Sequence, residues 1–357
     1  MRFIGNKENL IHAIYDVLKE RHISGNSFCD FFSGTTNVAR FFKKLNYKII
    51  SSDLLYFSYC LQKAYIVNNE EPKFKNLLSK ININSDRLFE EPLDIVIGYL
   101  NNLPLIDGFI YKNYSPLGSK SLEIPRMYFS DKNAQKIDSI RTKIEEWYKE
   151  KDINENEYFI LLACLIESVP FYANISGVYA AFRKKWDPRA LKDFRLRTIQ
   201  IISNNKNNLS FNENSINLID NIDVDILYLD PPYNERQYAP NYHLLETIAK
   251  YDNPDIKGIT GMRDYKTQKS NFCNKELAIK ELEKVIKQVK YKYLVLSYNN
   301  EGIMEQDKIL NLFNKYGNVE LVEFDYTRFK SNSNGLSKTK KQIKEQLYIF
   351  KKTGYKI

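Results

Sequence analysis

Apolar and polar positions alternate along this chain in a way that predicts short strands separated by amphipathic helices. Near the start, helical spacing of apolar side chains predicts a helix over 7–20. Short apolar runs then predict strands over 27–32 and 47–51, on either side of a helix over 37–45. The alternation returns near Ile222 and predicts strands over 222–229, 293–297, 319–324 and 346–350, and helices over 277–289 and 305–315. This pattern indicates an α/β protein.

The middle of the chain, residues 107–199, has a different pattern. Long helical periodicities cover 131–149 and 156–167, whereas the aromatic residues Phe109, Tyr111 and Tyr114 are expected to lie in a loop. We therefore expect a discontinuous sheet domain formed by 1–106 and 200–357, interrupted by a mostly helical insert over 107–199.

The strand expected over 222–229 ends at Asp230-Pro231-Pro232-Tyr233. Proline lacks a backbone N–H, so the two prolines end the strand and stiffen the turn that follows. Open α/β sheets bind ligands at the carboxyl ends of their strands, which is where this turn lies. The Asp230 carboxylate and the Pro231 carbonyl can accept from an amino group, while Tyr233 can stack on a planar ring.

A second candidate site is the turn Ser33-Gly34-Thr35-Thr36, between a predicted strand and a predicted helix. Small residues allow a ligand to approach the backbone, and Asp53, at the end of the next strand, can bind the two hydroxyls of a ribose. The chain has no GxxxxGK[ST] loop, and Thr36 stands where a dinucleotide-binding fold has its second glycine. A nucleoside beside an acceptor for a planar amine points to methyl transfer.

The composition of the chain adds one point to this interpretation, which is the kind of partner that the protein binds. The 357 residues carry a net charge of +9 and 14% aromatic residues, which suits a nucleic-acid partner, although a basic surface can also serve solubility alone. The four cysteines and three histidines show no metal-binding spacing, and the longest apolar stretch, 158–166, is too short to span a bilayer. We expect a cytoplasmic protein with no metal and no membrane contact.

Several segments together carry a resemblance to a known family. Asp230 to Tyr233 matches a catalytic motif, Asp30 to Gly34 resembles a glycine motif, and Arg2 to Lys7 resembles an N-terminal cofactor motif. The long string from Asn234 to Thr247 is the most specific, and 258–263, 296–302 and 326–330 extend the match. In these motifs and in their order the chain resembles the Dam-like, α-order class of DNA adenine-N6 methyltransferases, and most of all its FokI-type restriction–modification subgroup.

The resemblance implies an S-adenosylmethionine-dependent methyltransferase fold: a Rossmann-like mixed sheet with a mostly helical target-recognition insert. It implies that S-adenosyl-L-methionine lies over the Gly34 turn, with Asp53 at its ribose and Phe32 near its adenine, and that an adenine flipped out of duplex DNA reaches the catalytic motif. The family often has an acidic residue about 17 positions before the catalytic Asp, and here Glu213 or Asn214 occupies that region. The expected cofactor-binding residues are Phe3, Lys7, Asp30, Phe32, Ser33, Gly34, Asp53 and Asn214, and the expected catalytic residues are Asp230, Pro231, Pro232 and Tyr233.

Double-stranded DNA is the implied partner, and the basic part of the insert is where we expect contacts with it. A mobile basic loop is expected around Lys330, Lys338, Lys340, Lys341 and Lys344, and His243 is expected to be a packed residue rather than a base. The expected DNA-binding residues are Arg183, Lys184, Lys185, Arg189, Lys192, Arg236 and Gln237. A cognate restriction endonuclease would act on the same DNA site without needing to bind the enzyme.

Three alternatives stay open from the sequence. The same scaffold could methylate adenine in RNA or a free nucleoside, it could be an orphan regulatory DNA methyltransferase, or it could be a DNA-binding module without activity. The intact Asp230 to Tyr233 turn argues against the last of these.

Overall fold

The computed structural model describes residues 5, 7–81, 90–326 and 343–353. Phe3 and the predicted loop lysines Lys330, Lys338, Lys340 and Lys341 lie outside these residues. The described chain divides into two compact units, and each is continuous in space but not in sequence. The sheet unit contains residues 5–62, 203–238 and 266–353 as far as they are described, and the helical unit contains 63–202 and 239–265.

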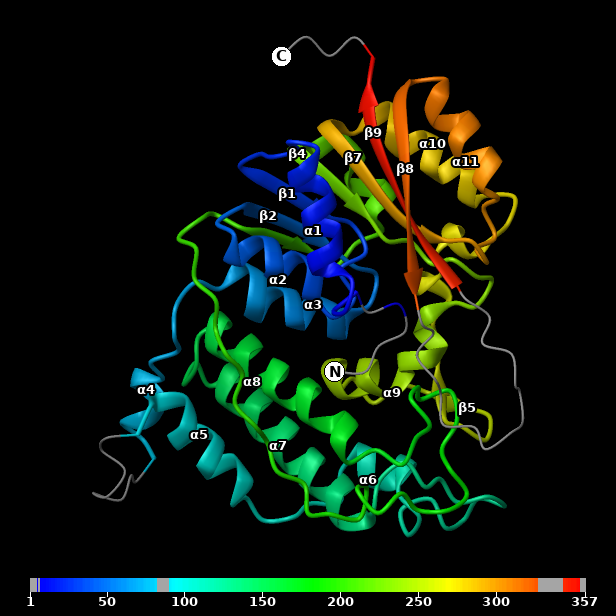
Figure 1. Cartoon of the computed structure of the whole chain (residues 1–357). Helices are drawn as coiled ribbons and strands as arrows, with labels where there is room; N and C mark the ends of the chain where they lie inside the picture. The colour runs from blue at the N-terminus through cyan, green and yellow to red at the C-terminus, as the bar shows by residue number, and fades with distance from the viewer. Residues whose placement is uncertain (1–4, 6, 82–89, 327–342, 354–357) are drawn as a thin grey trace. The chain divides into compact units, whose positions relative to one another are not determined.

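A seven-stranded, mostly parallel sheet forms the centre of the sheet unit (Figure 1). Its order is β3-β2-β1-β4-β7-β9-β8, and β9 alone runs in the direction opposite to the other six strands. The α/β class expected from the sequence is confirmed. The strands are β1 (Ser27–Asp30), β2 (Lys48–Ser52), β3 (Leu209–Phe211), β4 (Asp223–Leu229), β7 (Lys290–Asn299), β8 (Gly317–Tyr326) and β9 (Ile343–Lys352).

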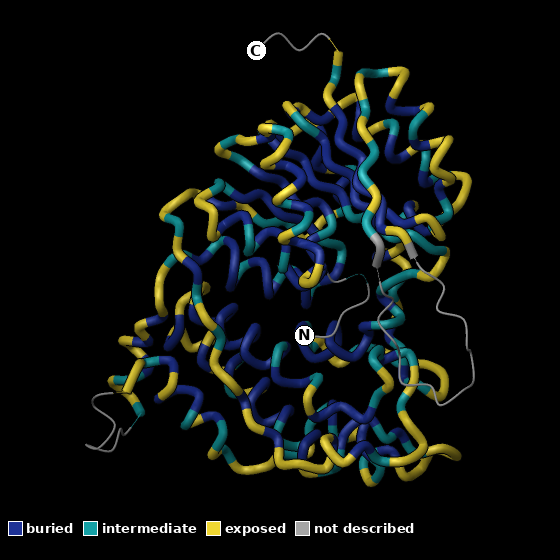
Figure 2. Tube along the Cα trace, viewed as in Figure 1, coloured by how far each residue is buried: buried dark blue, intermediate teal, exposed yellow. Residues whose placement is uncertain are grey.

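Helices cover both faces of this sheet. Side chains alternate between the faces along each strand, so Cys29 and Leu227 belong to one apolar cluster with Leu282 and Ile309 of the covering helices. On the other face Phe28 stacks on Phe42 with ring centroids 3.8 Å apart. Figure 2 shows that the central strands are buried along most of their length. The helices of the unit are α1 (Ile11–Glu20), α2 (Asn37–Lys44), α3 (Tyr56–Gln62), α10 (Ala278–Gln288) and α11 (Gln306–Asn314), with 3₁₀ turns η4 (Ser215–Asn221), η5 (Lys266–Gln268) and η6 (Asn271–Cys273).

The helical unit is built around two long helices joined by a tight connection. Ser130 caps α7 (Asp131–Lys149), and Asn154 and Glu157 form a reciprocal capping box at the start of α8 (Glu155–Ser168). The other elements are the π-helix η1 (Lys63–Val67), α4 (Lys75–Leu78), α5 (Pro92–Asn101), α6 (Phe109–Tyr114), the 3₁₀ turn η3 (Val169–Phe171), α9 (Tyr238–Lys250), β5 (Ile256–Lys257) and β6 (Met262–Arg263).

Two sequence expectations differ from this structure. The residues expected in an aromatic loop form the helix α6, because Ile110 and Tyr114 are fully buried and the Asp138 carboxylate accepts from the backbone N–H groups of Ile110 and Tyr111. The helical unit also extends beyond 107–199 on both sides: it takes in the described residues of 63–106 and residues 239–265, which were expected in the sheet domain.

Candidate active site

The candidate site lies in the sheet unit, at the carboxyl ends of β1, β2 and β4. The strand order proceeds from β1 to β2 on one side and from β1 to β4 on the other, so the chain's connections leave in opposite directions between β1 and β4. Such a switch point is where open α/β sheets bind ligands, because the loops on either side diverge. The glycine turn follows β1, Asp53 follows β2 and Asp230 follows β4, so the structure brings all three predicted motifs to this edge.

The glycine turn is fixed by Asp53. The Gly34 N–H donates to Asp53 Oδ2 at 2.8 Å, and the Leu55 N–H donates to Oδ1 at 2.9 Å. The Ser58 hydroxyl donates to the Gly34 carbonyl at 2.6 Å. Both Gly34 (φ +48°) and Thr36 (φ +65°) are left-handed. Thr36, which stands at an expected glycine position, therefore keeps the backbone conformation of a glycine at a cost in strain.

Two serines that no sequence motif indicated hold this edge together. The hydroxyls of Ser52 and Ser215 lie 3.0 Å apart, and both donate to the Phe31 carbonyl. Beside them the Asn214 side chain caps η4 by accepting from the Ile216 N–H at 3.2 Å. The network joins β1, β2 and η4. The one sequence signal for it is a serine at the end of a predicted strand, which is too common to predict such a network.

Asp30 is the most deeply buried carboxylate of the site. It is 2% exposed, and its Oδ1 is a buried acceptor without a hydrogen-bond partner. Burial, followed by the nearby charge of Asp230, raises the pKa of Asp30 to about 8. An unpaired buried acceptor of this kind is suited to a cationic or hydrogen-donating ligand group beside the glycine turn.

Asp230 shares one cation with a second carboxylate. Lys7 Nζ lies 3.3 Å from Asp230 Oδ1 and also pairs with Glu345 of β9. Burial raises the pKa of Asp230 to about 7; Lys7 opposes the rise and Glu345 adds to it. Burial alone would lower the pKa of Lys7, but the negative charges of Asp230 and Glu345 outweigh this effect and raise it. Sequence reasoning missed Glu345, since its partner Lys7 is 338 positions away.

The rest of the catalytic turn is anchored by its backbone. The Tyr233 carbonyl accepts from the Ile303 N–H at 3.0 Å, and its ring packs against the core on the α10–α11 side of the sheet. Pro231 is buried and Pro232 half-buried. Phe32 meets Phe272 edge to face, with centroids 5.2 Å apart, so an aromatic wall flanks the glycine turn.

Arg236 and Gln237, the two expected DNA-binding residues just after the catalytic turn, differ in their contacts. The Gln237 amide makes a reciprocal pair with the Ser270 backbone, donating at 3.1 Å and accepting at 2.8 Å. The Arg236 side chain is exposed. Gln237 therefore holds the loop before η6, whereas Arg236 is available to a ligand.

The basic segment of the helical unit is irregular rather than helical, and an acidic residue organises part of it. Asp187 pairs with Arg183 at 3.0 Å and with Arg189 at 2.8 Å, and hydrogen bonds from Arg189 lower the pKa of Asp187 to about 2. Lys184, Lys185 and Lys192 are exposed. His243 is buried in the same unit, and its Nε2 donates to the Tyr179 carbonyl at 2.9 Å, which agrees with the packed histidine expected from sequence.

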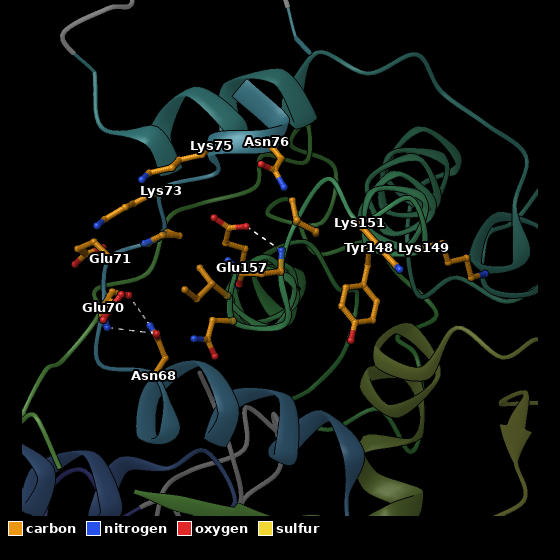
Figure 3. A pocket seen from close by; sticks show the side chains of 15 residues that line it. Asn68, Glu70, Glu71, Lys73, Lys75, Asn76, Tyr148, Lys149, Lys151 and Glu157 are labelled. Carbon is orange, nitrogen blue, oxygen red and sulfur yellow. Dashed lines mark hydrogen bonds between the residues drawn. The ribbon is translucent and has the colours of Figure 1, made fainter. Parts of the chain in front are cut away.

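A cavity of about 620 Å³ opens in the helical unit between the 68–76 segment and the α7–α8 connection (Figure 3). Its lysines lie at the rim, while Glu157 inside it accepts from the backbone N–H groups of Asn154 and Phe74. The Asn68 amide bonds to the backbone of Glu70. These polar groups maintain the local fold, and we assign no ligand to the cavity.

Within the described residues no helix is both long and apolar enough to cross a membrane. In the same part of the chain, no group of three or more His, Cys, Asp or Glu side chains is arranged to hold a metal ion.

Comparison with known proteins identifies the family of the chain. Residues 3–312 match the family described as D12 class N6 adenine-specific DNA methyltransferase. The chain is 42% identical to the type II methyltransferase M.FokI of Planomicrobium okeanokoites over 93% of its own length and 50% of that protein. It is 38% identical to the modification methylase StsI of Streptococcus sanguinis over 99% of its length and 52% of that protein.

The chain thus spans about half the length of these two relatives. It is also 37% identical to the type II methyltransferase M.NlaIII of Neisseria lactamica, over 99% of this chain and 100% of that one. The mostly parallel seven-stranded sheet agrees with the fold of S-adenosylmethionine-dependent methyltransferases. The chain belongs to the D12 class of N6 adenine-specific DNA methyltransferases.

Proposed function

We propose that this protein transfers the methyl group of S-adenosyl-L-methionine to the exocyclic amino group of an adenine that has been flipped out of duplex DNA. The observation that carries the proposal is the Asp230 to Tyr233 turn at the end of β4, beside the glycine turn at the end of β1. The similarity to type II methyltransferases and modification methylases supports a role in a restriction–modification system, and the proposal includes a cognate endonuclease that acts on the same site.

The cofactor supplies a methyl group on a positively charged sulfur, which needs no further activation. The residues around the glycine turn suit such a group: Asp30 has a free buried acceptor, and Phe32 and Phe272 offer aromatic surface. Asp53, fixed by Gly34 and Leu55, is the proposed ribose contact. Lys7, Ser33 and Asn214 remain proposed contacts of the same site.

The proposed work of the catalytic turn is to position and polarise the adenine amino group. The lone pair of an aromatic amine is delocalised into its ring, which makes the amine a poor nucleophile. Acceptance of its two hydrogens by the Asp230 carboxylate and the Pro231 carbonyl favours a pyramidal nitrogen whose lone pair points away from the ring. Tyr233 is the proposed stacking surface for the base. Asp230 accepts in this way only when it is ionised.

DNA contacts are proposed for the helical unit, which we take as the target-recognition part. Exposed Lys184, Lys185 and Lys192 suit phosphates, and Arg183 and Arg189, oriented by Asp187, suit phosphates or guanine edges. Arg236 is proposed to lie beside the flipped base.

The experiment is to incubate the protein with S-adenosylmethionine and unmethylated plasmid and to map N6-methyladenine by single-molecule sequencing. We expect methylation at one short motif. Asp230→Ala should reduce transfer by at least about 10³-fold while duplex binding persists. Asp223→Ala, at the exposed opposite end of β4, is the matched control and should keep full activity. Transfer to structured RNA but not to DNA, or full activity of Asp230→Ala, would overturn the proposal.

A further inference from the structure

Glu345 is a buried carboxylate that the proposed transfer reaction leaves without a role. It is 5% exposed, lies on β9 and takes part in the ion pair with Lys7. The Ser297 hydroxyl, on the adjacent strand β7, donates to Glu345 Oε1 at 2.8 Å, which fixes the side chain toward Lys7. A carboxylate this buried is costly unless it is paired, so its position beside the catalytic turn calls for an explanation.

Lys7 lies between two competing carboxylates. Its ammonium contacts both Asp230 and Glu345, and its carbonyl accepts from the N–H groups of Leu10 and Ile11, which fixes its backbone at the start of α1. With all three groups ionised, two negative charges share one positive charge. Lys7 therefore neutralises Asp230 only in part.

Methyl transfer to an amine releases a proton that needs an acceptor. As the nitrogen–methyl bond forms, the electrons of the sulfur–methyl bond stay on sulfur as a neutral thioether, and the nitrogen becomes transiently positive. Loss of one N–H proton restores a neutral methylamine. Asp230, which receives an amino hydrogen bond in the proposed function, is the nearest base on this path.

We propose that Glu345 is a positioning residue that draws the Lys7 ammonium partly away from Asp230 and so keeps Asp230 basic enough to take this proton. The inference rests on the proposed function. A carboxylate paired alone with a lysine is a weak base, whereas one that shares its lysine with another carboxylate holds a proton more readily. Asp230 then passes the proton to solvent, toward which its side chain is 18% exposed.

Four groups set the charge around Asp230. Lys7 precedes α1, Glu345 comes from β9, Asp30 ends β1, and the Tyr228 hydroxyl belongs to β4 itself. Lys7 stabilises the ionised form of Asp230, and Glu345 and Asp30 oppose it. Of the two acidic groups, Glu345 is the one that is paired with Lys7. The effect of removing Glu345 on the pKa of Asp230 should therefore depend on whether Lys7 is present, which Lys7 variants test.

The test is the pH dependence of single-turnover methyl transfer to duplex DNA with saturating cofactor. The wild-type rate should rise with pH around pH 7 as Asp230 ionises. In Glu345→Gln the rise should move to lower pH by about one unit, so that the fraction of the plateau rate kept at pH 6 increases from about a tenth to about a half. Glu320→Gln, an exposed carboxylate on β8, is the control and should leave the profile unchanged.

A double variant separates a role through Lys7 from a merely structural one. Lys7→Met leaves two carboxylates facing each other, so transfer at pH 7 should fall sharply; adding Glu345→Gln removes the repulsion and should restore at least about tenfold of the loss. If Glu345→Gln fails to fold, Ser297→Ala serves instead: it frees Glu345 to draw Lys7 further, and the rise should move to higher pH.

An unchanged pH profile in folded Glu345→Gln, or Lys7→Met/Glu345→Gln no more active than Lys7→Met, overturns the inference while the proposed function stands. Absence of transfer by the wild-type protein on both DNA and RNA overturns the proposed function itself. The two failures are therefore distinguishable in one assay.

Discussion

Asp30 should make the ligand-free protein less stable as the pH rises, and Asp30→Asn should remove this effect. Its pKa is about 8 in the folded protein against 3.8 for an unperturbed aspartate. The folded state therefore binds one more proton than the unfolded state between these values, and stability falls as the pH rises through this window. An asparagine mimics the protonated form and has no such dependence.

The magnitude follows from the window. Between pH 6 and pH 8 the unfolded-state carboxyl is fully ionised, while the folded-state group passes from protonated to half ionised. At 1.36 kcal/mol per pH unit, the advantage of Asp30→Asn over wild type should grow by about 2 kcal/mol between these two pH values. Comparing two pH values cancels any constant effect of the amide on packing.

Urea denaturation of both proteins at pH 6 and pH 8, followed by tryptophan fluorescence and circular dichroism, measures this difference. Asp223→Asn changes an exposed carboxylate on β4 and should show no growth of its effect with pH. An equal stability difference between Asp30→Asn and wild type at the two pH values would refute the reasoning, because Asp30 would then titrate in the same range when folded and unfolded.

Three further predictions concern residues away from the reacting atoms. Thr36→Gly should raise the free energy of unfolding by about 1 kcal/mol, because it removes a threonine that has a left-handed backbone and an unpaired buried hydroxyl. Thr35→Gly is the control: φ is not positive there, so the free energy of unfolding should fall, and urea titrations compare the two variants. Burial lowers the pKa of His243 to about 4, so wild type should lose about 2 kcal/mol of stability between pH 7 and pH 5, and a His243→Gln variant that keeps this loss would contradict the assignment. Arg126 donates to the Gly258 and Ile259 carbonyls of the β5–β6 turn and to the Asn113 carbonyl of α6. Arg126→Met should therefore cost about 3 kcal/mol and increase hydrogen exchange in that turn; unchanged exchange would show that the turn does not depend on it.

Segments with strong periodicity were predicted closely from the sequence. The helix expected over 131–149 has those bounds in the structure, and the strand before Asp230 ends as the prolines require. Both carry their own signal: long apolar periodicity for the helix, and an apolar run stopped by residues without backbone donors for the strand.

Elements whose stability comes from distant partners were not predictable in this way. The edge strand β3 (Leu209–Phe211) lies in an Asn-rich stretch and is only partly buried, so it has almost no hydrophobic pattern; it exists because β2 offers a free edge. α6 depends on Asp138, and the buried carboxylate of Glu345 is paired with Lys7. Pairings between residues so far apart leave no trace in local sequence spacing.

The path of the chain through the sheet has a consequence during synthesis on the ribosome. β4 pairs with β1 although about 190 residues separate them, and Glu345 of β9 meets Lys7 from near the start of the sequence. A nascent chain therefore carries its glycine turn long before the strand that bears Asp230 can dock, and the ammonium of Lys7 has no Glu345 until β9 emerges. Long-range pairing of this kind slows folding. If the proposed function holds, a ribosome-bound chain should thus be unable to methylate DNA until β9 has left the exit tunnel.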